Sequence, residues 1–512
     1  MFTTNRKSQV KYTFCKSGRT KKSDLRFITY PFYSMKHLIT LLLSCSFLFG
    51  FSQTITPDNP NIQYIGRFDL TTPTAPVFAW PGTTIKVKFK GTNLTLHLDD
   101  LALGGATTTN FFTIIIDGDI TSILETNKNT SSYLIAENLE NEEHVIQIFK
   151  RTESSVGSCR FKGFTTDASS LLPLERDERK IEFIGDSWTC GYGNEINSTP
   201  STTNTGFHSE NEDNYHAWGA IISKRLGAEY MCTAYSGRGV YRNNTGTTTG
   251  VLTSIFNHTI ADQASKPWDH SSFHPDVVVI KLGTNDFFKE TTEPMVPLDS
   301  ADFVGAEIDL VQQVRAAHPD ATIIVAFGSS KTDWWPSGLQ HLTRWRTYSN
   351  AVVSHFNNQG DQAVVSFEID SQQEPYGEDW HPSKATHEQI ATDVGQFIKL
   401  TMGWSGGTTD CNGVEGGTAF RDDCQRCVEG NTNLSPCSAV SGLFHTEKNA
   451  FHVYPNPTTS VVHFEEILNW QLTDLLGNSI QHGRSASCDL STSPTGSYIL
   501  TSGSAKVRIQ KN

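Results

Sequence analysis

Short runs of alternating apolar and polar residues fill the chain from residue 54 to about residue 168. The clearest runs are Thr84–Lys90, Asn93–Leu98, Phe112–Ile116 and His144–Phe149. Alternation at period 2 turns one face of each run toward a core, and short strands at regular spacing between turn residues are typical of a β-sandwich. The pattern therefore predicts an all-β domain of jelly-roll type over residues 54–170.

From about residue 175, apolar runs alternate instead with segments of helical period. The predicted strands are Ile181–Ile184, Val277–Leu282 and Ala321–Phe327. The predicted helices are His216–Leu226, Phe303–Ala317 and Thr386–Met402. Continuously apolar strands are those buried on both faces, and strand–helix alternation places helices on both faces of a parallel sheet. We therefore expect an α/β domain over residues 175–403.

Both ends of the chain depart from these patterns. Leu38–Phe51 is an apolar run of 14 residues, too short for a membrane-spanning helix of about 20 residues. Its basic start and small-residue end predict a secretory signal peptide over residues 35–52. Residues 1–34 hold eight Lys and Arg but one acid, so we expect them to be an untranslated or non-native leader. A true basic tail, or a lipoprotein cleavage site at Cys45, is the alternative.

Residues 404–445 are rich in Gly, Thr, Asn and Cys. Four cysteines lie there with 12, 2 and 9 residues between them: Cys411, Cys424, Cys427 and Cys437. In an exported chain this spacing favours a small two-disulfide module over a zinc site, and oxygen-bearing neighbours leave calcium binding open. Residues 450–512 contain short strands of a small β-sandwich. Four cysteines lie outside the Cys-rich module, the leader and the signal peptide: Cys159, Cys190, Cys232 and Cys488. Cys190 and Cys232 could form a disulfide with each other or remain buried free thiols.

Composition narrows the classes of function. The chain is 37% hydrophobic with 10 Trp and 30 Phe, which excludes a largely disordered protein. The net charge of −13 at pH 7 argues against nucleic acid as a partner, because phosphates require basic patches. The charge does not exclude neutral substrates such as polysaccharides or small esters.

Four motifs in the α/β domain carry groups suited to nucleophilic catalysis. They are Gly185-Asp186-Ser187, Ser236-Gly237-Arg238-Gly239, Gly283-Thr284-Asn285-Asp286 and Asp379-Trp380-His381-Pro382. A serine where a strand ends and a helix begins exposes its hydroxyl and its unpaired N–H. A glycine N–H and an asparagine amide can stabilise an oxyanion, and histidine is the usual base for serine. Each motif alone is an ordinary turn, so the prediction depends on their order within one domain.

These four blocks resemble the SGNH (GDSL-type) hydrolases. Gly185–Glu195, GDSWTCGYGNE, and Asp379–Ser383, DWHPS, are similar to carbohydrate esterase family 2, and the likeness covers about residues 60–402. It implies a jelly roll followed by a flavodoxin-like SGNH domain that deacetylates plant polysaccharides such as xylan or mannan, with neither metal nor cofactor. By this resemblance Ser187 is the nucleophile and His381 the general base.

The resemblance also implies an oxyanion hole formed by the N–H groups of Ser187 and Gly237 and by the side chain of Asn285. Gly239 is the alternative to Gly237.

The chain departs from the family pattern at the residue that orients the histidine. The family usually has Asp three residues before His, where this chain has Glu378, while Asp379 lies two before. We predict Asp379 as the third catalytic residue, with Glu378 or a backbone carbonyl as alternatives. Trp334 and Trp335, after the Ala321–Phe327 strand, are predicted to form a sugar-stacking wall, and packing is the alternative.

The C-terminal segment resembles the type A sorting domain of the type IX secretion system. The likeness lies in Val453–Pro457, Leu472–Gly477 and Gly496–Tyr498. It implies a protein of the Bacteroidetes that is secreted or held at the cell surface, with the type IX machinery as a partner. Because the apolar run Leu38–Phe51 is too short to span a bilayer, we expect no membrane span. Two rival functions stay open: an esterase or lipase acting on other small esters, and a non-catalytic carbohydrate-binding surface protein.

Overall fold

The computed structural model describes residues 52–404 and, beyond them, 420–421, 427–428, 453–454, 460–473, 479–494, 496–502 and 505–511. The predicted leader and nearly all of the predicted signal peptide lie outside these residues. So does most of the predicted Cys-rich module, including Cys411, Cys424 and Cys437. The chain divides into two compact units, Met1–Gly417 and Thr418–Asn512.

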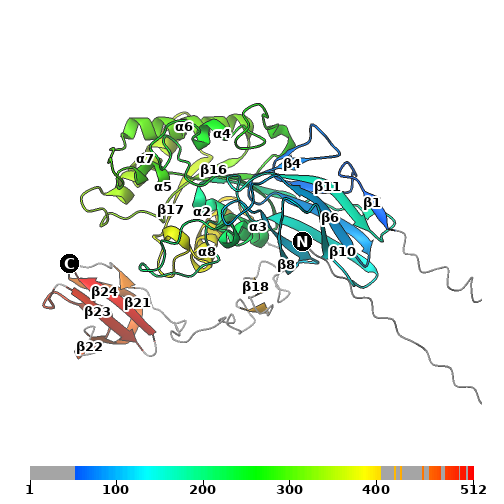
Figure 1. The fold of residues 1–512 in the computed structure, drawn as a ribbon. Coiled ribbons are helices and arrows are strands. Elements are labelled where there is room, and N and C mark those ends of the chain that lie inside the picture. The colour runs from blue at the N-terminus through cyan, green and yellow to red at the C-terminus, as the bar shows by residue number, and fades with distance from the viewer. Residues whose placement is uncertain are drawn as a thin grey trace, which may run out of the picture. The chain divides into compact units, whose positions relative to one another are not determined.

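The first unit begins with a β-sandwich (Figure 1). Its strands are β1 (Gln53–Ile55), β2 (Gln63–Ile65), β3 (Phe68–Asp69), β4 (Val77–Phe78), β5 (Thr84–Gly91), β6 (Leu94–Asp100), β7 (Phe111–Ile116), β8 (Asp119–Glu125), β9 (Ser132–Ala136), β10 (Glu142–Lys150), β11 (Cys159–Thr166) and β12 (Leu171–Leu172). One six-stranded antiparallel sheet has the order β3-β4-β11-β6-β9, with β1 on β11. The other has the order β12-β5-β10-β7-β8, with β2 on β5.

Period-2 alternation fills the space between these sheets. In β5, Ile85, Val87 and Phe89 are buried, whereas Lys86 and Lys88 between them are partly exposed. The buried set packs with inward residues of the facing sheet such as Leu96. The sandwich therefore forms a core of its own.

The α/β domain follows, built on one parallel sheet of order β14-β13-β15-β16-β17. These strands are β13 (Arg179–Gly185), β14 (Ala228–Ala234), β15 (Val277–Lys281), β16 (Thr322–Gly328) and β17 (Val364–Ile369). The chain runs from β13 to β14 on one side and then returns to place β15 on the other side. Such a reversal opens a crevice at the carboxyl ends of the strands, where ligands bind in sheets of this kind.

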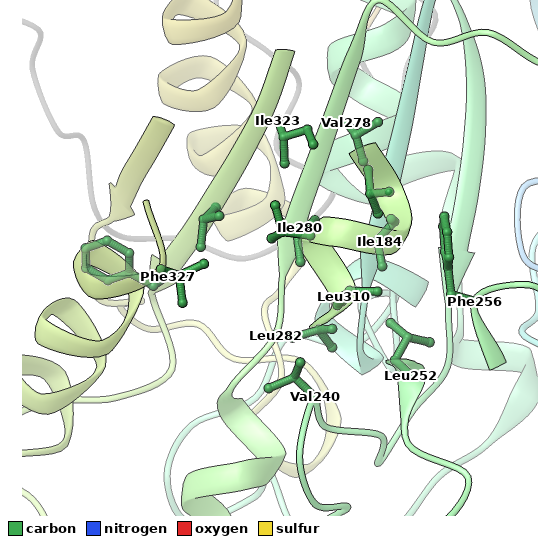
Figure 2. Close-up of a cluster of buried hydrophobic side chains, with 14 of the residues drawn as sticks. Ile184, Val240, Leu252, Phe256, Val278, Ile280, Leu282, Leu310, Ile323 and Phe327 are labelled. Carbon is green, nitrogen blue, oxygen red and sulfur yellow. The ribbon is translucent and has the colours of Figure 1, made fainter. Parts of the chain in front are cut away.

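Helices cover both faces of this sheet. The α-helices are α2 (Ser187–Cys190), α3 (Trp218–Leu226), α4 (Leu252–Ile255), α5 (Thr284–Phe288), α6 (Ser300–Ala317), α7 (His341–Asn358) and α8 (Lys384–Thr401). Short 3-10 helices lie at η1 (Ser209–Asn211), η2 (Asn214–His216), η3 (His270–Ser272) and η4 (Glu378–Trp380). α3 and α8 share one apolar cluster with the sheet, and α6 and α7 share the other. Figure 2 shows this second cluster, with Ile184, Ile280 and Ile323 of the strands near Leu310 of α6.

A buried ion pair joins the sandwich to the α/β domain. Arg67 Nη2 lies 2.9 Å from Glu182 Oε1 of β13, and both side chains are buried. The Arg67 guanidinium also donates to the carbonyl oxygens of Phe256 and His258 and packs over the Trp80 ring. The α/β domain thus supplies the carboxylate and carbonyl acceptors of both Arg67 Nη atoms, and the sandwich supplies an aromatic face.

The second unit contains β18 (Phe420–Arg421), β19 (Cys427–Val428), β20 (Val453–Tyr454), β21 (Val461–Thr473), β22 (Ser479–Asp489), β23 (Gly496–Ser502) and β24 (Ala505–Lys511). β18 pairs with β19, and the other five strands form one antiparallel sheet, β20-β21-β23-β24 with β22 on β21. Val462, Leu472 and Leu500 are among its buried side chains.

The predicted fold class is confirmed: a jelly-roll-like β domain precedes a parallel α/β domain, and a β-sheet lies near the C-terminus. α7 and β17 were not predicted. Among the buried positions of α7, His341 and Ser349 are polar, so its apolar stripe is sparse and gives little periodic signal. Among the described residues, no helix has both the length and the apolar character needed to cross a membrane.

Candidate active site

The turn after β13 exposes Ser187 at the carboxyl edge of the sheet. Gly185 ends the strand, and a Cβ there would lie 2.1 Å from Thr189 Oγ1, so only glycine fits. Asp186 caps α2 by accepting the Trp188 N–H at 3.0 Å. As the first residue of α2, Ser187 has an N–H without a carbonyl partner in the helix. Its hydroxyl and this N–H are therefore both placed to act on one ligand.

The imidazole of His381 lies against the Ser187 hydroxyl. His381 Nε2 is 2.7 Å from Ser187 Oγ, and His381 Nδ1 is 2.9 Å from the main-chain oxygen of Glu378. A carbonyl oxygen only accepts, so Nδ1 carries the proton and Nε2 presents its lone pair to the serine. Burial lowers the pKa of His381 from its ordinary value of 6.5, which favours the neutral ring. The pair thus has the arrangement of a nucleophile and its base.

The carboxylate of Asp379 lies elsewhere. It accepts hydrogen bonds from Tyr192 Oη at 2.7 Å and from the Gly206 N–H at 3.1 Å. The Glu378 carboxylate accepts from Asn211 Nδ2 at 2.6 Å. Asp379 was predicted to orient His381 through Nδ1, but the group next to Nδ1 is the main-chain carbonyl oxygen of Glu378. The structure therefore has the backbone alternative.

The backbone conformation explains why Asp379 turns away. Asp379 and Trp380 have φ values of 49° and 64°, in the left-handed region that non-glycine residues seldom adopt. Thr203 holds them there: its carbonyl accepts the Asp379 N–H at 2.6 Å, and its hydroxyl accepts the Trp380 N–H at 2.8 Å. The tight turn brings the Glu378 carbonyl under the imidazole and directs the Asp379 side chain to Tyr192. The Tyr192 ring in turn stacks on His381 with centroids 4.0 Å apart.

The loop after β14 carries the predicted glycine donor. Tyr235 to Arg238 form a turn closed by a 3.3 Å bond from the Arg238 N–H to the Tyr235 oxygen. Gly237 is its third residue, with φ of 76°, where a type II turn needs glycine. Within residues 52–404, no acceptor takes the Gly237 N–H. The Gly239 N–H instead faces Asn243 Oδ1 at 3.4 Å, which favours Gly237 as the oxyanion donor.

Asn285 approaches this loop from the end of β15. Its Nδ2 donates to the Arg238 oxygen at 2.8 Å, and its side chain is buried. An amide NH₂ has two hydrogens, so this bond orients the group and leaves one hydrogen for a ligand. The structure thus gathers Ser187, Gly237 and Asn285, which come from three strand ends, at one edge of the sheet.

Asp286 is a site residue to which the sequence analysis gave no role. Its buried carboxylate accepts the N–H groups of Val240, Tyr241 and Arg242 at 3.1, 2.8 and 2.9 Å. Burial raises its pKa to about 6. Asp286 therefore ties the glycine loop to the segment that carries Asn285. The sequence did carry a signal for this role, because Asp286 is an acidic residue that follows an apolar strand and directly succeeds Asn285.

Lys281, the last residue of β15, was also missed. Its buried Nζ lies 3.7 Å from Asp186 Oδ1, 4.5 Å from the centre of the Trp188 ring and 2.8 Å from Thr284 Oγ1. It therefore links the serine turn to the asparagine segment. Its place inside the continuous apolar run gave no sign of this contact.

The two predicted substrate-binding tryptophans are on the surface. Trp334 and Trp335 are 78% and 58% exposed, in the loop between β16 and α7. The start of this loop reaches the site segment, where Ser330 Oγ is 3.0 Å from Thr284 Oγ1. Their exposure leaves a role in sugar stacking as a prediction. Trp380, beside His381, is a third exposed tryptophan at 43%, which the sequence analysis did not single out.

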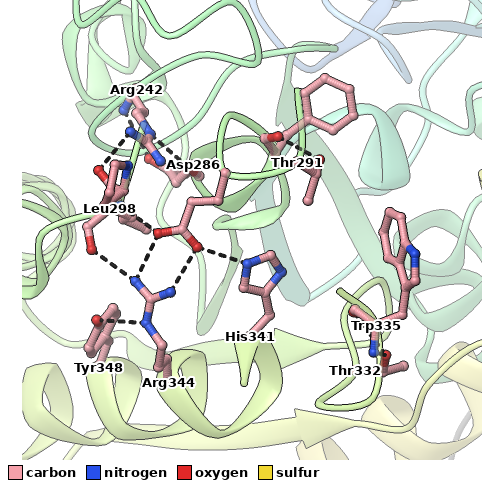
Figure 3. A network of polar contacts seen from close by, with 12 residues as sticks. Arg242, Asp286, Thr291, Leu298, Thr332, Trp335, His341, Arg344 and Tyr348 are labelled. Atoms are coloured by element: carbon pink, nitrogen blue, oxygen red, sulfur yellow. Dashed lines mark hydrogen bonds and ion pairs between the residues drawn. The ribbon is translucent and has the colours of Figure 1, made fainter. Parts of the chain in front are cut away.

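Figure 3 shows the polar contacts of His341 and Arg344, which hold the end of this loop. The Glu290 carboxylate accepts from His341 Nε2 at 2.8 Å and from both Nη atoms of Arg344, all at the start of α7. Arg242 Nε donates to the main-chain oxygen of Asp286 at 2.8 Å, and its Nη1 donates to the main-chain oxygen of Pro297 at 3.2 Å. The next residue, Leu298, accepts from Arg344 Nη2 at 2.9 Å through its main-chain oxygen. The loop that carries Trp334 and Trp335 and the loop that carries Gly237 are thus held by the same polar network.

The described cysteine side chains are thiols. Cys159, Cys190, Cys232 and Cys488 are all free and buried. Of the two alternatives left open for Cys190 and Cys232, the structure therefore has the buried thiols.

Comparison with known proteins agrees with this architecture. Residues 64–174 match the family model "Carbohydrate esterase 2 N-terminal", and residues 183–389 match "GDSL-like Lipase/Acylhydrolase family". The fold and site define a GDSL-type carboxylic ester hydrolase that carries a β-sandwich ahead of its α/β domain.

Individual relatives narrow this class to one family. The chain is 36% identical over 356 residues to the cellulase/esterase CelE of Acetivibrio thermocellus, covering 69% of this chain but 41% of CelE. It is 32% identical over 263 residues to an acetylxylan esterase / glucomannan deacetylase of Cellvibrio japonicus, covering 49% of this chain and 69% of that protein. A family two carbohydrate esterase from Clostridium thermocellum, solved in complex with cellohexaose, is 35% identical with a TM-score of 0.60. That match covers 67% of this chain and all of the solved one. The chain belongs to carbohydrate esterase family 2.

Proposed function

We propose that this protein is a serine esterase that removes O-acetyl groups from plant cell-wall polysaccharides, acetylxylan or acetylated mannan, through an acetyl-serine intermediate. The observation that carries the proposal is the 2.7 Å contact between Ser187 Oγ and the unprotonated Nε2 of His381. Two matched relatives are named acetylxylan esterase / glucomannan deacetylase, which supports the substrate class.

In the first half of the reaction, Ser187 Oγ attacks the acetyl carbonyl carbon and its proton passes to His381 Nε2. The imidazolium that forms is stabilised through Nδ1 by the Glu378 carbonyl oxygen, 2.9 Å away. Negative charge develops on the acetyl oxygen, where the N–H groups of Ser187 and Gly237 and the Asn285 amide donate to it. Each such donor contributes about 3 kcal/mol to lowering the barrier.

The second half regenerates the enzyme. The tetrahedral intermediate collapses, His381 gives its proton to the departing sugar oxygen, and the free hydroxyl of the polysaccharide leaves. A water molecule then loses a proton to His381 Nε2 and attacks the acetyl-serine. The same three donors stabilise the second oxyanion; as it collapses, His381 returns the proton to Ser187 Oγ and acetate leaves.

Recognition of the polymer falls to the exposed aromatic side chains near the site. Trp334 and Trp335 offer flat apolar faces on which sugar rings stack, and their loop is fastened to the Asn285 segment through Ser330. We further propose that the chain acts outside the cell or at its surface. The signal-peptide pattern of residues 35–52 and the resemblance of residues 450–512 to a type IX sorting domain support this location.

The test compares wild type with Ser187→Ala. Wild type is expected to release acetate from 4-nitrophenyl acetate, acetylated xylan and acetylated glucomannan, and Ser187→Ala to release none above background. Unchanged release by Ser187→Ala would remove the hydrolase mechanism. Faster turnover of a short-chain lipid ester than of either polysaccharide would instead assign other esters as the substrate. An inactive wild type that binds the polysaccharides would indicate a non-catalytic carbohydrate-binding protein.

A further inference from the structure

A carboxylate from the β-sandwich reaches beneath the active site of the α/β domain. Glu153 lies between β10 and β11 of the sandwich and is 1% exposed. Its Oε2 accepts the Ser236 N–H at 2.7 Å. Ser236 directly precedes Gly237, so a residue of the first domain holds the turn that presents an oxyanion donor.

The same oxygen also reaches the nucleophile's helix. Cys190 Sγ, in the last residue of α2, lies 3.7 Å from Glu153 Oε2. α2 begins at Ser187. One carboxylate oxygen therefore bridges the two segments whose spacing decides whether the Gly237 N–H meets an oxyanion formed at Ser187.

Glu153 is itself held in place. Its N–H donates to Glu212 Oε2 at 2.9 Å, and its carbonyl oxygen accepts from the buried Lys150 Nζ at 3.2 Å. Burial, followed by the charge of Glu153, raises the pKa of Glu212 well above its usual range, which favours a proton on Glu212. The turn around Glu153 is thus anchored from both domains and has little freedom to move.

The cluster is better explained by hydrogen bonding than by a metal ion. Ligand atoms of Glu153, Cys190 and Glu212 lie within 4.8 Å of one another, as in a metal site. However, the Glu153 and Glu212 carboxylates already accept the N–H groups of Ser236 and of Glu153. Glu212 Oε1 has no hydrogen-bond partner among the described residues, but burial raises the pKa of Glu212 well above its usual range, which favours a proton on this carboxyl group that a cation would have to displace.

The geometry of the turn shows what the contact controls. The peptide group that joins Ser236 to Gly237 carries the donor N–H, and the flanking polar groups are fixed on both sides. Glu153 holds the Ser236 N–H, and the Asn244 N–H donates to the Gly237 oxygen at 2.9 Å. Without Glu153, the Ser236 N–H loses its acceptor and one of the two anchors is gone.

We propose that Glu153 is a positioning residue for the ester hydrolysis, through which the β-sandwich sets the oxyanion turn against the nucleophile. The inference rests on the proposed function, because it needs an oxyanion at Ser187. It makes the sandwich a part of the catalytic apparatus as well as a neighbouring domain.

The test uses three substitutions of Glu153 in the full chain. Glu153→Ala removes the acceptor, and Glu153→Asp keeps the carboxyl group but shortens the side chain by one methylene. Both are expected to lower kcat for 4-nitrophenyl acetate about 10- to 100-fold with little change in KM, somewhat less than complete loss of an oxyanion donor. Glu153→Gln keeps the length and an accepting oxygen, so its kcat should stay within about threefold of wild type.

A second readout reports the oxyanion hole directly. An arylboronic acid adds to the serine oxygen to give a tetrahedral anion, and its inhibition constant should rise in Glu153→Ala and Glu153→Asp by about the factor lost in kcat. If Glu153→Ala does not fold, the proposal is tested by comparing kcat of Glu153→Asp with kcat of Glu153→Gln. A kcat equal to wild type in both Ala and Asp, or equal losses in Asp and Gln, would overturn the proposal.

Glu182→Gln is the matched control. Glu182 is also a buried glutamate that contacts the other domain, through Arg67, but it lies outside the site. It is expected to lower the thermal midpoint and leave kcat unchanged. An equal loss of kcat in this variant would reduce Glu153 to a general role in domain stability. Ser187→Ala separates the two proposals: if it stays active, the hydrolase mechanism itself fails, whatever Glu153 does.

Discussion

The Asp379 carboxylate offers the sharpest test of how His381 is oriented. In a Ser–His–Asp triad, replacing the aspartate by asparagine lowers kcat about 10⁴-fold because the imidazole takes the wrong tautomer. That factor corresponds to about 5.4 kcal/mol at 1.36 kcal/mol per tenfold. Here the tautomer is set by the Glu378 carbonyl oxygen, 2.9 Å from Nδ1, and this group survives every side-chain substitution.

The cost of Asp379→Asn can be worked from its two contacts. The carboxylate accepts from Tyr192 Oη and the Gly206 N–H, and an asparagine oxygen keeps one of them. Losing the other costs about 1.5–3 kcal/mol of local stability. Part of this cost reaches His381 through the stacked Tyr192 ring. We therefore expect kcat to fall by about tenfold or less.

The assay is hydrolysis of 4-nitrophenyl acetate, with kcat and the thermal midpoint measured for Asp379→Asn and for Glu378→Gln. Glu378→Gln is the matched control, because it removes the neighbouring carboxylate while its main-chain carbonyl stays. A loss above about 10³-fold in Asp379→Asn, without a lower thermal midpoint, would refute the reasoning. It would mean that the carboxylate and not the carbonyl fixes the imidazole.

Three further outcomes follow from the geometry. Burial lowers the pKa of His381 and only the neutral ring accepts a proton, so kcat/KM should rise with pH along a limb whose apparent pKa lies below the ordinary 6.5. A limb above that value would contradict the assignment. Asn285→Ala should lower kcat about 100-fold with KM nearly unchanged, and a loss under about threefold would show that the oxyanion does not depend on this amide. Arg67→Ala removes the guanidinium from the buried Glu182 carboxylate, which keeps Thr233 Oγ1 at 2.7 Å and His318 Nε2 at 3.3 Å, and should cost about 3–5 kcal/mol in urea unfolding, whereas an unchanged midpoint would mean that His318 or water replaces the guanidinium.

The elements that could be predicted are those in which the buried positions follow a regular apolar pattern. β15 and β16 lie inside the sheet with helices on both faces, so nearly every position is apolar and the strand is visible without any knowledge of its neighbours. The same logic exposed Ser187 and Asn285, because each follows directly after such a strand. α7 escaped because polar groups fill part of its buried face, and His341 is there to meet Glu290.

The sequence by itself determined the order of the domains, the strands of the parallel sheet and the residue types at their ends. These depend on local periodicity and on which side chains can act as nucleophile, base or donor. Only the tertiary structure decided which groups complete the site. The acceptor at His381 Nδ1 is a main-chain carbonyl, which no amino-acid letter records, and it faces the ring because Asp379 and Trp380 adopt left-handed conformations. The partner of Ser236 lies 83 residues away in another domain. Such contacts arise when two packed domains exclude water from their boundary, and their buried polar groups must then find each other.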